Sequence, residues 1–319
     1  VLEGVMMRGP SKSAIAVRKS DGDIDLEVKN NSSLVAKLKL TKIPIVRGCV
    51  AFFDSLIVGV SATMHSAEFI DLEPEEDETP SKFDDFIERH FGDKMLTIVM
   101  WVSVCLALVI GIGLFMLLPT VIAGGLKSLF VNETFIRFPQ AFVDAVSPVM
   151  TNHIMLNLIE SVTRIVIFIL YMVLVSKLKD MQRVFEYHGA EHKSIACYEA
   201  GAELTPENAK TFTRFHPRCG TSFLLIVMVI SILFFSFLTW DNVWMRIGLR
   251  LLLLPVVAGV SYEIIKFAGR SKSKCVAWLT KPGLWLQRLT TREPDESQLE
   301  VAIASLKAVL PTEGEDDRW

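Results

Sequence analysis

The chain has 319 residues, of which 51% are hydrophobic and 22% charged, and its mean hydropathy is +0.40. This composition excludes an ordinary soluble domain and indicates a membrane protein. The net charge of −3 gives no support for direct nucleic-acid binding, and five cysteines form no disulfide framework, as in a reducing compartment.

The first 30 residues favour β-strands. Residues 13–28 alternate apolar and polar side chains on either side of Ser20-Asp21-Gly22, which predicts a hairpin, and residues 1–10 can add a further strand. Residues 49–64 are apolar but short for a membrane span, so we expect an amphipathic or half-inserted helix there. Whether residues 49–64 or 119–153 enter the bilayer is left open.

Four apolar runs of about 20 residues are long enough to cross a bilayer as helices. They cover residues 96–118, 154–175, 221–240 and 247–267. The second contains Glu160 and Arg164, one helical turn apart, which can neutralise each other on one face. The fourth contains Arg250 and Glu263, which can snorkel or face protein.

Basic residues orient these four spans. Lys and Arg are frequent before the first span, between the second and third, and after the fourth, and they are sparse in the other two connections. By the positive-inside rule, both termini then lie in the cytoplasm.

The predicted fold is a mainly α polytopic membrane protein with a small N-terminal β-hairpin region and amphipathic interfacial helices. We expect three regions. Residues 1–95 form a cytoplasmic part with the strands, an amphipathic helix and an acidic loop. Residues 96–267 form the four-helix membrane domain with a cytoplasmic loop at 176–220, and residues 268–319 form an interfacial, helical tail.

The loop at 176–220 contains the candidate chemistry. His188 and His192 are four residues apart, so on a helix their imidazoles lie one turn from each other, as two ligands of one metal ion would. Glu191 completes the order H-x-x-E-H, in which a Glu can act as the base toward a metal-bound water.

His216 and Cys219, in "HPRC", supply a second half of the site. Imidazole and thiolate suit zinc, whereas magnesium and calcium prefer oxygen ligands, and iron and manganese stay open as alternatives. Four protein ligands would make zinc a structural clip, while three ligands and a water would make a catalytic site with Glu191 as base. The plain alternative is a histidine pair that only lines the polar interface.

Three further charged residues can have either a functional role at this site or a purely structural one. Glu263 can orient a ligand histidine or pair with a basic residue at the interface. Arg214 and Arg218 can bind an anion or lipid headgroup, or they can anchor the loop at the membrane.

Five motifs, in order, resemble one known family. They are "VLEGVMMRGP", "PIVRG", "YHGAEHKSIACYEAG", "RFHPRCGTSFL" and the "YE" of the last span. The chain resembles the YqhQ-like bacterial membrane protein family (domain of unknown function 1385), whose members are labelled predicted metal-dependent enzymes. The resemblance implies a multi-pass protein of the bacterial cytoplasmic membrane, with His188, His192, His216 and Cys219 as metal candidates, and it names no substrate.

We therefore expect a zinc-dependent hydrolase that acts on a membrane-associated substrate at the cytoplasmic surface. The rival is a non-enzymatic scaffold or accessory factor, for example in membrane-protein biogenesis, with a structural zinc. The expected partners are the lipid bilayer and, for the rival, another integral membrane protein.

Overall fold

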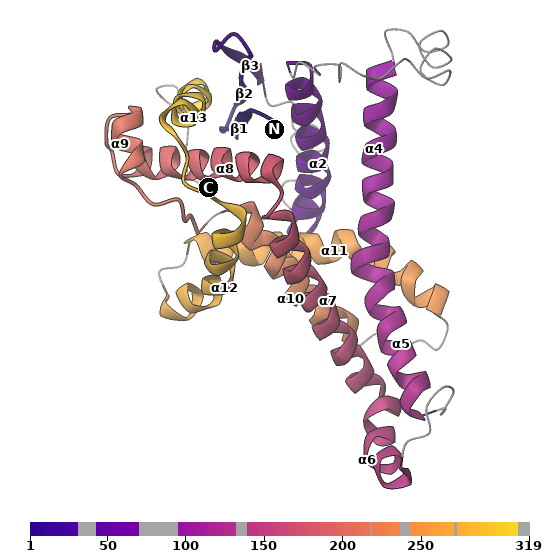
Figure 1. The fold of residues 1–319 in the computed structure, drawn as a ribbon. Coiled ribbons are helices and arrows are strands. Elements are labelled where there is room, and N and C mark those ends of the chain that lie inside the picture. The colour runs from indigo at the N-terminus through magenta and orange to yellow at the C-terminus, as the bar shows by residue number, and fades with distance from the viewer. Residues whose placement is uncertain are drawn as a thin grey trace.

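A computed structural model describes residues 1–30, 43–69, 95–131, 139–217, 219–236, 243–270 and 273–311. The protein is mainly helical, with one small sheet near the N-terminus (Figure 1).

The sheet is formed by β1 (Gly4–Arg8), β2 (Lys12–Arg18) and β3 (Ile24–Asn30), antiparallel in the order β1-β2-β3. The turn between β2 and β3 contains Gly22 with φ of 91°, a conformation that glycine adopts without a Cβ clash. The predicted hairpin and the additional first strand are both confirmed.

The two ends of the chain meet on this sheet. One face packs against α13 (Glu296–Val309) and α8 (Lys179–Glu199), and the shared core includes Ala14, Ala16 and Leu299. The Ser305 hydroxyl donates to the Ala14 carbonyl at 3.0 Å. The other face packs on the end of α2 (Val46–Ala67) through Ala62. The first and last predicted regions therefore contribute to one folded unit, which lies around α8 in Figure 1.

The remaining helices connect to this unit or extend away from it (Figure 1). They are α4 (Met95–Ile112), η3 (Gly113–Leu117, a π-helical turn), α5 (Leu118–Val131), α6 (Gln140–Thr151), α7 (His153–Val175), α9 (Pro206–Lys210), α10 (Gly220–Ser236), α11 (Val243–Arg270) and α12 (Lys274–Thr290).

Four helices in the described part of the chain are long and apolar enough to cross a membrane: Val46–Ala67, Trp101–Val131, His153–Val175 and Ile247–Phe267. Three of them overlap predicted spans. The fourth, α2, covers the segment for which we expected a short interfacial helix, and at 22 residues it is long enough to span. The predicted span at 221–240 corresponds to α10, whose apolar part, Phe223–Phe235, is shorter, and residues 237–240 lie outside the described residues.

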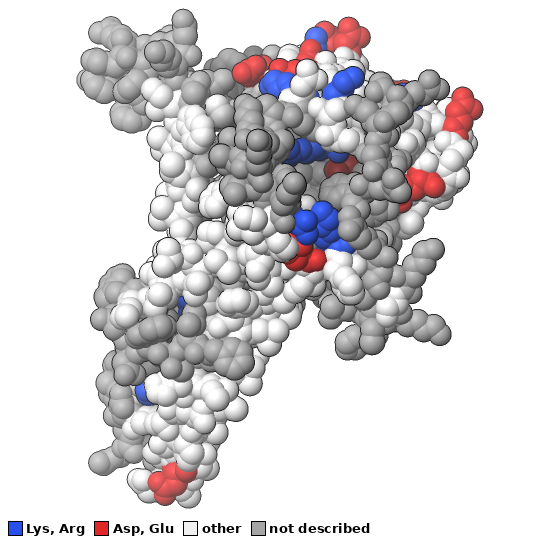
Figure 2. All heavy atoms as spheres, turned by 180° about the vertical axis from the view of Figure 1, so that it is seen from behind, with Lys and Arg blue, Asp and Glu red and all other residues white. Residues whose placement is uncertain are grey.

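Figure 2 supports a bilayer association. Charged side chains gather mainly at the end of the molecule that holds the sheet, and the long column below it is mostly uncharged down to an acidic tip. Many large apolar side chains of the long apolar helices are exposed, including Val109 of α4, Val121 of α5 and Leu252 of α11, each about two-thirds or more exposed. Apolar area of this extent indicates contact with lipid. The orientation with cytoplasmic termini stays a prediction.

A break separates the helix of the second predicted span from the helix that follows it. α7 ends at Val175, and α8 begins at Lys179 after a turn, with Leu178 in an extended conformation. The Arg292 guanidinium donates to the Ser176 carbonyl at 3.2 Å, which satisfies a backbone group at this end. Because of the break, α8 lies across the ends of α7 and α10 in Figure 1.

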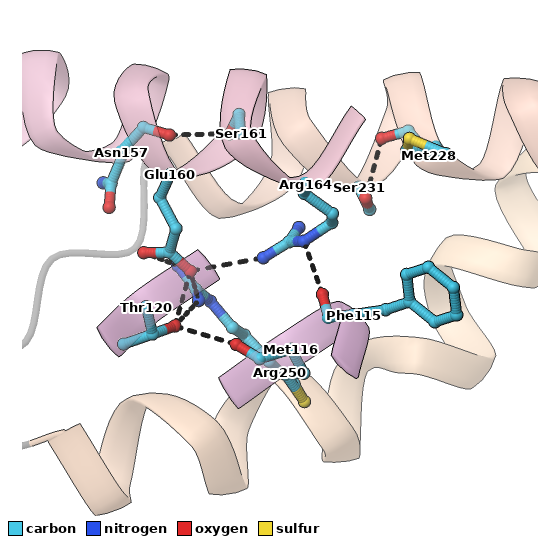
Figure 3. A network of polar contacts seen from close by, with 10 residues as sticks. All are labelled: Phe115, Met116, Thr120, Asn157, Glu160, Ser161, Arg164, Met228, Ser231 and Arg250. Carbon is cyan, nitrogen blue, oxygen red and sulfur yellow. Dashed lines mark hydrogen bonds and ion pairs between the residues drawn. The ribbon is translucent and has the colours of Figure 1, made fainter. Parts of the chain in front are cut away.

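A buried polar network joins three of the apolar helices (Figure 3). Glu160 of α7 accepts hydrogen bonds from Arg250 of α11 through both carboxylate oxygens, and from Arg164 at 3.2 Å. Thr120 of α5 lies 2.7 Å from Glu160. The predicted Glu160–Arg164 pair is confirmed, and Arg250 faces protein.

The π-helical turn η3 takes part in this network. The Arg164 Nε donates to the Phe115 carbonyl at 3.0 Å, a carbonyl within the turn where the regular α-helical pattern is interrupted. The Arg250 guanidinium also lies over the Phe235 ring at 5.5 Å. Ion pairs, a backbone carbonyl and an aromatic face therefore hold these charges among apolar helices.

Candidate metal centre

α8 positions the two histidines on one face. Its opposite face is buried against the sheet and α13 through Tyr187, Ala190 and Cys197, which fixes the rotation of the helix. His188 and His192 then lie one turn apart on the side away from this core, with ring centroids 4.5 Å apart. The predicted helical spacing is realised in three dimensions.

Cys219 reaches these histidines from the segment just before α10. The His188 Nε2 lies 3.2 Å from the Cys219 Sγ, and one ligand atom from each of His188, His192 and Cys219 lies within 4.8 Å of the others. His192 and Cys219 are buried and His188 is half-buried. Among the described residues this His-His-Cys group is the one that can hold a metal ion.

Two backbone carbonyls orient the histidines. The Nδ1 of His188 lies 2.8 Å from the Thr290 carbonyl oxygen, and the Nδ1 of His192 lies 2.5 Å from the Arg214 carbonyl oxygen. A carbonyl accepts only, so each Nδ1 must carry the proton, and each Nε2 keeps its lone pair for a metal. The sequence gives no signal for these partners, because any residue type supplies a carbonyl.

The surroundings of Cys219 lower the pKa of its thiol. Burial works to raise its pKa, but it is outweighed by the hydrogen bond and positive charge that His192 supplies when both of its ring nitrogens are protonated, together with hydrogen bonds from Thr221. In that state of His192, without a metal ion, the pKa of the thiol lies below its ordinary value. The thiolate is the form that binds metal. Two imidazole lone pairs and one thiolate fit the donor preference of zinc.

His216 lies outside the three converging ligand atoms. Its Nε2 lies 3.3 Å from a carboxylate oxygen of Glu199, and its ring centroid is 5.8 Å from that of His192. Its backbone is held by the fully buried Gln287, which accepts from the His216 N–H at 2.9 Å and donates to its carbonyl at 2.7 Å. His216 therefore contributes to the placement of the segment that ends at Cys219.

Lys193 supports the same segment from α8. Its ammonium group donates to the carbonyls of Lys210 and Phe212 at 2.9 and 2.8 Å, and it pairs with Glu293 at 2.9 Å. Gln287 and Lys193 were not among the predicted site residues. For Gln287, the sequence signal of a structural role was a polar side chain within an apolar, Trp-bearing stretch.

Glu191 is half-buried and lies close enough to His188 for an electrostatic interaction. Burial raises the pKa of its carboxyl, and the charge of His188 works in the opposite direction. Within the described residues its carboxylate accepts no hydrogen bond, so it is available to a proton on a neighbouring group.

The other three candidate residues are distributed as follows. Glu263 binds the Arg47 guanidinium through both of its oxygens, with 2.6 Å between Nε and Oε1, and does not contact the histidines. The Arg214 side chain pairs with Glu293 at 3.1 Å, and its backbone carbonyl is the part that meets His192. Arg218 lies outside the described residues.

Comparison with known proteins identifies the family. A family model described as "Protein of unknown function (DUF1385)" matches residues 43–312. The chain belongs to this family. It is also 33% identical over 317 residues to the "Uncharacterized protein YqhQ" of Bacillus subtilis (strain 168). The aligned region covers 98% of this chain and 91% of that protein. No solved structure matches.

Proposed function

We propose that the protein is a zinc-dependent hydrolase of the bacterial cytoplasmic membrane, with zinc held by His188, His192 and Cys219. The observation that carries this proposal is the convergence of two oriented imidazoles and a buried thiol. Three protein ligands are the number found in catalytic zinc sites, where the fourth position is left to water or substrate. Iron and manganese suit parts of the same ligand set.

Glu191 is the proposed general base. Zinc, when bound, supplies a water molecule of lowered pKa. Glu191 would be the residue that accepts a proton from the attacking water, and burial raises the pKa of its carboxyl above the ordinary value. The carbonyls of Thr290 and Arg214 keep both histidines in the ligating tautomer.

The location of the site favours a membrane-associated substrate. Cys219 directly precedes the apolar helix α10, and Thr290 ends α12, which contacts α10. A site at the end of membrane helices meets substrates that lie at the bilayer surface. The positive-inside pattern of the sequence favours the cytoplasmic side for this surface.

Metal analysis of the protein, purified in mild detergent without chelator, tests the first half of the proposal. About one zinc per chain is expected, and the double variant His188→Ala, His192→Ala should lose it. The matched control is His153→Ala, at the start of α7, which should keep its metal. Equal metal content in all three proteins would refute the assignment.

Glu191→Gln tests the second half. The variant should retain zinc and lose hydrolysis of p-nitrophenyl esters by a factor of about 10²–10⁴, the usual contribution of a general base. Hydrolysis at the wild-type rate in this variant would reject Glu191 as the base.

A second function, a scaffold with a structural zinc, is favoured by one observation. The ligands come from two elements, α8 and the segment before α10, so a bound ion would fasten the cytoplasmic unit to a membrane helix. Four protein ligands, with His216 as the fourth, would support this function, and X-ray absorption at the zinc edge distinguishes four protein ligands from three ligands and a water. A stoichiometric membrane-protein partner would point the same way.

A further inference from the structure

The segment that joins α12 to α13 lies directly on α8 (Figure 1). It consists of Thr290, the last residue of α12, and residues 291–294, and we call it the strap. The Thr290 carbonyl oxygen lies 2.8 Å from the His188 Nδ1, and the Arg292 N–H donates to the Phe185 carbonyl at 2.8 Å. The strap therefore runs over the part of α8 that carries the first metal candidate.

Gly189 faces the strap at its point of closest approach. A Cβ built at Gly189 would lie 2.0 Å from the Arg292 carbonyl oxygen and 3.5 Å from the Pro294 Cδ. Real Cβ atoms stay at least about 3.0 Å from other heavy atoms, and the obstacle here is backbone rather than the end of a flexible side chain. Farther along the strap, Glu293 pairs with Lys193 at 2.9 Å. The contacts at positions 185, 189 and 193 are spaced by four, so they lie on one side of α8.

The absence of a side chain, and not backbone freedom, is what this position requires. Gly189 lies inside α8, and its φ is not in the left-handed region that favours glycine. Glycine weakens a helix interior relative to alanine, so its presence there needs a reason. The close approach of the strap supplies that reason.

A displaced strap would affect both halves of the metal centre. The Thr291 N–H and hydroxyl both donate to the Gln287 carbonyl, at 2.9 and 2.7 Å, which ties the strap to the last turn of α12. That turn contains Thr290, whose carbonyl orients His188, and Gln287, whose side chain holds the His216 backbone. The least displacement that a Cβ would force is about 1 Å, and a movement of that size takes a 2.8 Å contact beyond hydrogen-bonding distance.

We propose that Gly189 is a positioning residue of the metal centre. Its missing side chain lets the strap seat on α8. The seated strap keeps the Thr290 carbonyl on His188 and holds α12 in register with the segment that ends at Cys219. Gly189 supplies no ligand atom and acts through these partners. The inference rests on the proposed zinc site and does not depend on hydrolysis.

Zinc affinity and cobalt spectra of the full-length protein in mild detergent test this role. Gly189→Ala should bind zinc about 10–100-fold more weakly than wild type in a chelator competition, the usual effect of losing a group that orients a metal ligand. Loaded with Co²⁺ in place of zinc, the variant should also show altered visible absorption, because the cobalt bands report ligand identity and geometry.

Gly9→Ala is the matched control. Its Cβ would lie 2.2 Å from the Val309 carbonyl oxygen, so it forces a comparable backbone clash within the same folded unit. Gly9 lies in the turn between β1 and β2 and has no part in the strap. This variant should keep the wild-type zinc affinity and cobalt spectrum, whatever stability it loses.

Thr291→Val keeps the test decisive if Gly189→Ala does not fold. It removes the hydroxyl that ties the strap to Gln287 and leaves the side-chain volume nearly unchanged. Zinc affinity should fall about 2–10-fold, the effect of one hydrogen bond, and the cobalt bands should change as well.

The outcomes separate this role from the proposed function. A wild-type affinity and spectrum in Gly189→Ala, or in Thr291→Val if the first variant does not fold, would overturn the inference and leave the metal centre in place. Equal losses in Gly189→Ala and Gly9→Ala would also overturn it, since they would reflect a general loss of stability. Weaker zinc binding by Gly189→Ala alone supports the role even where wild type hydrolyses no ester, a result that rejects only the hydrolase. Absence of zinc from wild type would reject the metal centre, and the positioning role with it.

Discussion

The buried network around Glu160 allows a sharp test of how the membrane helices hold together. Glu160→Leu removes the acceptor of two guanidinium groups, and the side chains of Arg250 and Glu160 are each only 3% exposed. Removing one partner from a buried ion pair costs about 3–5 kcal/mol, because an uncompensated charge stays behind. We expect a loss of about 4 kcal/mol, which corresponds to a fall in Tm of about 10 °C for a chain of this size.

The triple variant Glu160→Leu, Arg164→Leu, Arg250→Leu provides the comparison. It removes the charges together, so most of the stability should return, to within about 1 kcal/mol of wild type. Thermal unfolding in mild detergent, followed by tryptophan fluorescence, measures both variants. A single variant as stable as wild type, or a triple variant less stable than the single one, would refute the reasoning.

Three further predictions concern the site and its supports. Gln287→Leu leaves the buried N–H and carbonyl of His216 without their Gln287 partners. Zinc affinity, measured by chelator competition, should then fall about 10–100-fold. Unchanged affinity would show that the segment ending at Cys219 does not depend on the two hydrogen bonds from Gln287. Asp295 caps α13; burial works to raise its pKa, but hydrogen bonds from Ser297 and the Gln298 backbone hold it below its ordinary value, so Asp295→Ala should cost about 1 kcal/mol at pH 7. The stabilising form is the carboxylate, so this difference should shrink as the pH falls through the lowered folded-state pKa in melts from pH 7 to pH 3. A difference constant with pH would contradict it. Gly48→Leu places a Cβ 2.8 Å from the Gly259 backbone between α2 and α11, and should cost about 1–3 kcal/mol in the same melts, whereas stability equal to wild type would mean that the two helices separate freely.

Local features of the fold were predictable from the sequence because they depend on neighbouring residues. The hairpin follows from alternation around Gly22, and the end of α8 follows from Gly201, whose φ is 70°. Thr205, a residue type that favours the N-cap, caps α9 with its hydroxyl oxygen 3.3 Å from the Asn208 nitrogen, and Pro206 occupies the first helical position.

Long-range features were not predictable from the sequence, because nothing local encodes them. No glycine or proline marks the break after Val175, where Arg292, more than a hundred residues later, binds the turn. The partnership of Arg250 with Glu160 depends on how α11 crosses α7.

The candidate site was predictable from the sequence only in part. Helical spacing brought His188 and His192 together, and the short "HPRC" turn brought Cys219 to them. The His216 ring lies beside Glu199 of α8, and the His216 backbone is bound by Gln287 of α12. Spacing in the sequence does not specify either partner.

The contact between Ala14 and Ser305 has a consequence for the newly made chain. The two residues are 291 positions apart. At a synthesis rate of about 5–20 residues per second, the sheet waits roughly 15–60 s for α13 to cover its apolar face. The carbonyl of Thr290, which orients His188, also becomes available only near the end of synthesis. A chain that terminates before α13 therefore leaves the apolar face of the sheet uncovered, and a chain that terminates before Thr290 also lacks the carbonyl that orients His188.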